Sequence, residues 1–70
     1  MNESYKQTRI IKEAVYNYIK EHNGKCDLVD VACQFNEYTI DVPGLAVHEL
    51  IEEGKVERSE GVGNRLYVKD

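Results

Sequence analysis

This chain of 70 residues lacks any apolar run that could cross a membrane. No stretch approaches the ~20 consecutive apolar residues that a spanning helix requires. The first six residues, MNESYK, lack the basic region and apolar core of a secretory signal. We therefore expect a cytoplasmic protein with no membrane partner.

Cysteine is also scarce. A secreted domain of this size usually carries several disulfides, whereas this chain has only Cys26 and Cys33. The two thiols could form a zinc site with His22 and His48, but C-x6-C is not a usual spacing for zinc ligands. We expect buried free thiols, surface imidazoles, and neither a metal nor another cofactor.

The patterns that catalysis needs are missing as well. The only serines are Ser4, near a terminus, and Ser59, so no nucleophile elbow exists. Gly61-Val62-Gly63 resembles part of a phosphate loop, but no helical pattern follows it. No paired carboxylates suggest acid–base chemistry, and so short a chain leaves little volume for a substrate pocket. We expect a protein that is not an enzyme and has no small-molecule substrate.

An excess of positive charge is absent too, because nine basic residues stand against thirteen acidic ones and the formal net charge is −4. Proteins that bind nucleic acid through phosphates usually show a basic balance or a basic face. Any hypothesis of DNA binding must therefore rest on local charge.

Apolar spacing predicts three amphipathic helices, near residues 7–22, 27–34 and 41–53. We expect Asp27 and Asp41 to be N-caps, Pro43 to lie in a first helical turn, and Gly24 and Gly54 to end helices. The expected buried residues of the three helices are Ile10, Ile11, Ala14, Val15, Tyr18, Ile19; Leu28, Val31, Ala32, Phe35; and Pro43, Ala46, Val47, Leu50, Ile51.

Two alternating stretches near residues 55–59 and 65–69 predict a hairpin with its turn at 61–64. A lone hairpin is marginal in water, so Val56, Leu66 and Val68 must pack on the helices. The sequence thus predicts an α+β fold in one domain spanning residues 1–70, with three helices and a C-terminal two-stranded β-hairpin.

This order of elements, and the stretch LIEEGKVERSEGVGNRLYV in particular, resembles the winged helix-turn-helix superfamily, with small phage and bacterial regulators as the nearest likeness. The resemblance implies that the third helix enters the major groove of DNA and that the wing follows the backbone. The outward face of this helix would be Asp41, Leu45, His48 and Glu52. That face has none of the Arg, Lys, Asn or Gln side chains that usually read bases, although Glu can accept from cytosine. The alternative is that Asp41 is a cap and Glu49, Glu52 and Glu53 form a solvated face.

The expected wing is more favourable for DNA, because its strands carry four basic residues against the acids Glu57 and Glu60. Ordinary cross-strand charge pairing is the alternative. The candidate DNA contacts are Lys55, Arg58, Asn64 and Arg65, with Thr39 and His48 at the third helix.

A second candidate surface is a stripe on the first helix, which we expect to lie opposite the apolar stripe. Its members are Tyr5, Arg9, Lys12, Tyr16 and Lys20. Tyrosine beside basic residues is common at binding surfaces, and the first helix of winged helices often docks partners. The alternative is a solvated face with lysine stems over tyrosine rings. Repulsion between like charges opposes pairing of two stripes, so we expect a monomer at micromolar concentration.

Two functions remain open from the sequence. The first is a small non-enzymatic DNA-associated regulator of transcription that contacts duplex phosphates with its wing. The second is a protein-interaction module that docks a partner through the acidic third helix or the stripe of the first helix.

Overall fold

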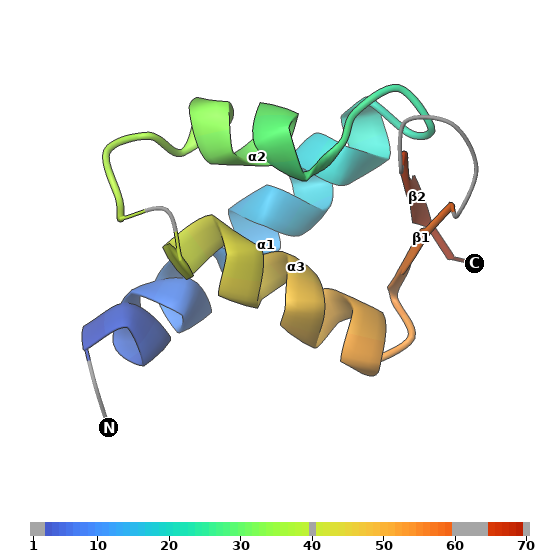
Figure 1. Cartoon of the computed structure of the whole chain (residues 1–70). Helices are drawn as coiled ribbons and strands as arrows, with labels where there is room; N and C mark the ends of the chain where they lie inside the picture. The colour runs from blue at the N-terminus through green and yellow to red at the C-terminus, as the bar shows by residue number, and fades with distance from the viewer. Residues whose placement is uncertain (1–2, 40, 60–64, 70) are drawn as a thin grey trace.

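The computed structural model describes residues 3–39, 41–59 and 65–69, with side chains from Lys6 onward. The elements follow in the order α1 (Glu3–Glu21), α2 (Leu28–Gln34), α3 (Asp41–Glu52), β1 (Val56–Arg58) and β2 (Leu66–Val68). The three helices pack together and the antiparallel sheet lies at one end, far from the beginning of α1 (Figure 1). This is the predicted α+β layout of a winged helix-turn-helix, with a longer first helix and shorter strands than expected. In the described part of the chain, no helix is long and apolar enough to cross a membrane.

The first helix, α1, packs against α3 along a narrower stripe than predicted. Its buried residues are Thr8, Ile11, Val15 and Ile19. Ile10 is 74% exposed and Ala14 is also exposed, so their predicted burial is wrong. Both lie at the edge of the stripe, where no described element covers them. Thr8 takes a place in the core because its hydroxyl can donate to the carbonyl of Val42 at 3.3 Å.

The second helix, α2, begins as predicted at the N-cap Asp27. The Asp27 carboxylate accepts from the Asp30 N–H at 3.0 Å, and the Asp30 carboxylate accepts from the Asp27 N–H at 3.1 Å. This reciprocal pair satisfies two amides that the helix itself leaves free. Val31 is fully buried, whereas Ala32 and Phe35 are half-buried. Leu28 is 42% exposed, contrary to its predicted burial, because only one side of this short helix faces α1 and α3.

The third helix, α3, begins at Asp41, so the prediction that Asp41 is the N-cap is wrong. The N–H of Val42 donates to the carbonyl of Thr39, which places Asp41 inside the first turn. Its predicted apolar side is confirmed, with Ile51 half-buried and the other members buried. Gly54 ends the helix at φ +76°, where the N–H groups of Gly54 and Lys55 bond to the carbonyls of Ile51 and Leu50.

Backbone hydrogen bonds on both edges of β2 hold the hairpin in place. Val56, Glu57 and Arg58 of β1 pair with Val68, Tyr67 and Leu66 of β2. On the other side, the link between α1 and α2 forms an isolated bridge from Cys26 to Leu66. The Asn23 side chain accepts from the N–H of Val68 at 2.9 Å.

The predicted apolar contacts of the hairpin are confirmed, because Val56 and Leu66 are buried and Val68 is half-buried. Cys26 is buried as expected, and this burial raises the pKa of its thiol. Cys33 is exposed, which corrects the prediction of two buried thiols.

Candidate functional site

The basic side chains of the wing lie on exposed positions of the hairpin. Lys55 and Lys69 lie opposite each other, because the Lys69 N–H donates to the Lys55 carbonyl at 2.9 Å. Arg65 lies opposite Ser59, whose N–H donates to the Arg65 carbonyl at 2.8 Å, and Arg58 pairs with Leu66. All four basic side chains are exposed. The hairpin therefore carries the predicted contacts Lys55, Arg58 and Arg65. Arg58 lies on the same face of the sheet as its partner Leu66, whereas Lys55 and Arg65 flank the strands.

Most of these charges have no acidic partner in the part of the chain that the structure describes. Within the described ranges, Arg58, Arg65 and Lys69 form no ion pair, and Lys55 pairs weakly with Glu53 at 3.6 Å. Glu57 stands directly opposite Tyr67 in the ladder, so direct cross-strand pairing with this acid does not account for these residues. Glu60, the other acid of the hairpin, lies outside the described residues. Three cations are available to an external anion.

The other candidate DNA contacts lie apart from the wing. Thr39 is exposed just before α3, whereas the wing follows the end of this helix, which is about 18 Å long. His48 is exposed midway along α3, with its ring 3.4 Å from the Glu52 carboxylate one turn later. Asn64 lies outside the described residues. The site that the structure supports is therefore smaller than the predicted one.

The exposed surface of α3, the helix that would enter the major groove, carries acidic side chains. Asp41, His48 and Glu52 are exposed on α3, and Leu45 is half-buried. A broader signal lies in the sequence itself, because residues 26–54 contain seven acidic residues and no Lys or Arg. All nine basic residues fall in 6–25 and 55–69. This separation extends over several elements, so the pattern of a single helix does not show it. It makes α2 and α3 an acidic unit and leaves the wing basic.

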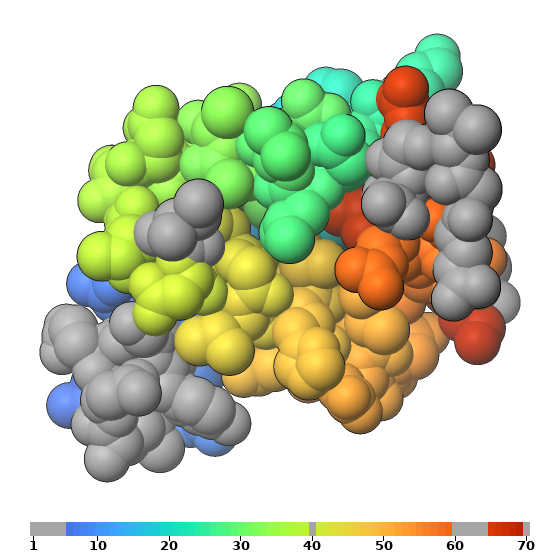
Figure 2. All heavy atoms as spheres, viewed as in Figure 1, coloured from blue at the N-terminus to red at the C-terminus, as the bar shows by residue number. Residues whose placement is uncertain are grey.

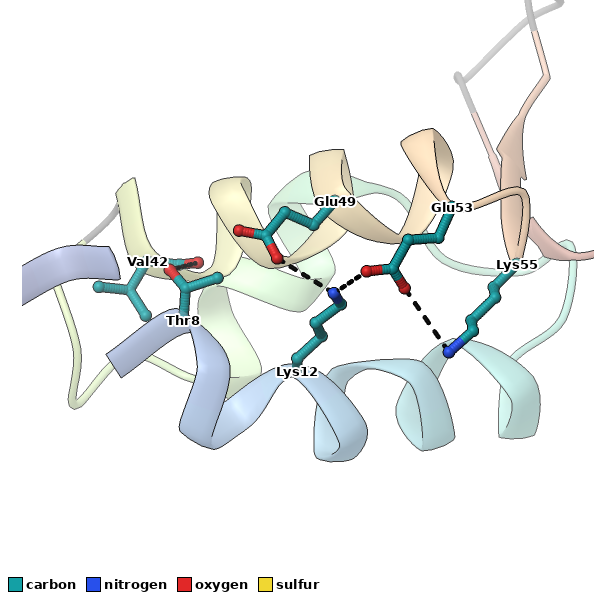
Figure 3. A network of polar contacts seen from close by, with 6 residues as sticks. All are labelled: Thr8, Lys12, Val42, Glu49, Glu53 and Lys55. Carbon is teal, nitrogen blue, oxygen red and sulfur yellow. Dashed lines mark hydrogen bonds and ion pairs between the residues drawn. The ribbon is translucent and has the colours of Figure 1, made fainter. Parts of the chain in front are cut away.

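The stripe on α1 was predicted to lie opposite the apolar side of the helix. In the structure its middle part borders α3 instead. The ammonium of Lys12 donates to Glu49 at 3.0 Å and also bonds to Glu53, which in turn faces Lys55 (Figure 3). Tyr16 is half-buried and packs on the core. The interpretation of Glu49 and Glu53 as a purely solvated face is therefore wrong.

The remaining members of the stripe add little to a docking surface. Arg9 and Lys20 are exposed, and the Tyr5 side chain lies outside the described part. Lys12 and Tyr16 are engaged within the molecule, and both line an open hollow between α1 and the end of α3. The monomeric state stays a prediction.

The contact of Lys12 with Glu49 and Glu53 predicts how the stability of the domain depends on pH. The hydrogen bond from Lys12 lowers the pKa of Glu53, and the same bond raises the pKa of Lys12. A depressed carboxyl pKa contributes stability above the ordinary value of about 4.3, and this contribution is lost as the pH falls through the folded-state pKa. We expect the urea midpoint to fall across this acidic range.

The matched variant is Lys12→Met, which keeps the length of the side chain and removes its charge. The acid-induced fall of the urea midpoint should be smaller in this variant. High salt should also reduce this fall in the parent protein, because salt screens the ion pair. An identical pH profile in the two proteins would contradict the assignment of this ion pair.

Among the described residues, no group of three His, Cys, Asp or Glu side chains could hold a metal ion. His22 and His48 are both exposed, as predicted. No protein-family model, curated protein or solved structure matches this chain.

Proposed function

We propose that this protein is a small non-enzymatic DNA-associated regulator that contacts duplex phosphates with its wing. The observation that carries the proposal is that Arg58, Arg65 and Lys69 are exposed on one hairpin and have no ion-pair partner among the described residues. DNA carries one negative charge per ~1.7 Å of its axis, so such cations gain by releasing its counterions.

The charge distribution supports an orientation with the wing toward the duplex. Residues 55–69 have a formal balance of +2, whereas the rest of the chain carries −6. A field of this polarity turns the wing toward a polyanion and the acidic α2 and α3 away from it. Contacts to phosphates position a protein on DNA without selecting a sequence. The proposal therefore assigns no base-reading role to the acidic α3.

The two free cysteines support a reducing compartment, so the proposal places the protein in the cytoplasm. There we expect it to bind DNA weakly and without preference for a sequence. Proteins bound by such contacts alone typically show dissociation constants of about 10⁻⁴ to 10⁻⁶ M at physiological salt.

Fluorescence anisotropy of a labelled duplex of random sequence tests the proposal. We expect binding at low salt and a slope of about −2.7 for log K against log salt, as three neutralised phosphates predict. Replacing Arg58 and Arg65 with alanine together should make the slope shallower by about 1.8.

The matched control is Lys6→Ala, which removes an exposed cation near the N-terminus, at the end of the molecule away from the wing. It should leave the salt slope unchanged. Absence of binding at low salt would overturn the proposal, and so would an unchanged slope in the Arg58 and Arg65 double variant.

A further inference from the structure

The outward side of α2 is apolar and has no cover among the described residues. Val29 is 68% exposed, Leu28 is 42% exposed, and Cys33 is exposed. Together with Ala32, Asn36 and Tyr38 they line a shallow groove on the surface. An apolar groove on an otherwise polar domain is the form of many sites that bind another protein.

Helical spacing shows that this apolar side is separate from the core. Val31 points into the core and is fully buried. Val29 and Cys33 are four residues apart, as are Leu28 and Ala32, so the two pairs form neighbouring rows on the exposed surface. A helix that is apolar on nearly all sides is normally buried. The outer rows of α2 therefore have the composition of a contact surface.

The charge around the groove selects the kind of partner. Asp30 and Glu37, on α2 and in the turn after it, are both exposed. The surfaces of α2 and α3 adjoin on the face shown in Figure 2, and residues 26–54 of this unit contain no basic residue. Such a surface repels phosphates, and attracts a protein segment that carries Lys or Arg beside its apolar residues.

We propose that the exposed side of α2 is a docking site for a basic amphipathic helix of a protein partner. The apolar side of that helix lies on Leu28, Val29 and Cys33, and its flanking cations lie near Asp30 and Glu37. A second copy of this chain is a poor occupant, because a two-fold contact would set two acidic units against each other. The site lies on the acidic part of the molecule, so it does not rest on DNA binding by the wing.

The small size of the site limits the affinity with which it can bind a partner. The seven residues of α2 span about 10 Å, which corresponds to two turns of a bound helix. Burying one valine side chain is worth about 1.5 kcal/mol, or roughly tenfold in affinity. Removing the apolar side chain of Val29 should therefore be measurable even for a weak complex.

The probe is a synthetic peptide of about four helical turns, built from Leu and Lys with the leucines on one side. Amide-shift mapping should place the peptide on residues 28–38. The double variant Val29→Ser and Cys33→Ser should weaken binding at least about tenfold. Ile10→Ser is the matched control, because it removes a comparably exposed apolar side chain from α1 and should leave the affinity unchanged.

Several outcomes would overturn the proposal. One is equal binding of a scrambled peptide of the same composition, which would show charge attraction without a groove. Another is a shift pattern away from α2, and a third is self-association of the domain that Val29→Ser abolishes. The Arg58 and Arg65 double variant should bind the peptide like the parent, so loss of DNA binding and loss of docking are separable results.

Discussion

Replacing Leu66 with alanine is expected to lower the free energy of unfolding by about 3 to 4 kcal/mol, the largest effect of any change considered for this protein. Leu66 is fully buried and lies in β2, between β1 and the link that carries Cys26. Truncating a buried leucine removes its transfer energy and leaves a cavity, at a cost of about 2 to 5 kcal/mol. A domain of this length has only about 4 to 10 kcal/mol in total, so the variant should lose a large fraction of its stability.

Urea denaturation followed by circular dichroism measures this loss. The control is Ile10→Ala, which also shortens an aliphatic side chain but at a position that is 74% exposed. It should change the stability by less than about 0.5 kcal/mol. A loss below about 1 kcal/mol for Leu66→Ala would show that the wing is not part of the cooperative core.

Replacing Gly24 with alanine is expected to cost about 2 to 3 kcal/mol. Gly24 has φ +74°, a conformation that costs a residue with a side chain about 1 to 2 kcal/mol. An added Cβ would also lie 2.7 Å from Cε1 of Tyr67, so the ring must move. Because the Gly24 N–H donates to the Leu66 carbonyl at 2.9 Å, this movement occurs where the link joins β2.

Gly54 provides the matched control for this change. Its φ of +76° is nearly the same, but an added Cβ meets no atom within 4 Å. Gly54→Ala should therefore cost only the conformational part, about 1 to 2 kcal/mol. Adding Tyr67→Ala to the Gly24 variant should recover part of the difference. Equal losses for the two glycine variants would contradict a steric role of Tyr67.

The ends and types of the elements were predictable from the sequence because they depend on neighbours along the chain. The N-cap Asp27 bonds to a residue three positions away, and Gly54 ends α3 through bonds that span no more than five residues. The start of α3 near residue 41 was also predicted, and only the cap was misassigned, because Asp41 lies within the first turn. The alternating pattern of the wing likewise predicted its buried residues.

Tertiary packing determined which apolar residues of the helices are buried and which are exposed. Ile10 and Leu28 satisfy a helical apolar pattern as well as Ile11 and Val31 do, yet they are exposed. Periodicity shows that a helix has an apolar side, but the width of the buried stripe depends on how many other elements lie against it. In the described part of the chain, three helices and a hairpin leave one side of α2 without a neighbour.

The sequence by itself determined where the charges stand along the chain, with a basic wing and an acidic unit over residues 26–54. Only the tertiary structure decided which of them are free. Lys12 meets Glu49 and Glu53 across 37 and 41 residues, whereas the wing cations Arg58, Arg65 and Lys69 meet no acid in the described part of the chain. Coulomb attraction depends on distance in space, and distances between residues so far apart in sequence are set by the packing of α1 on α3.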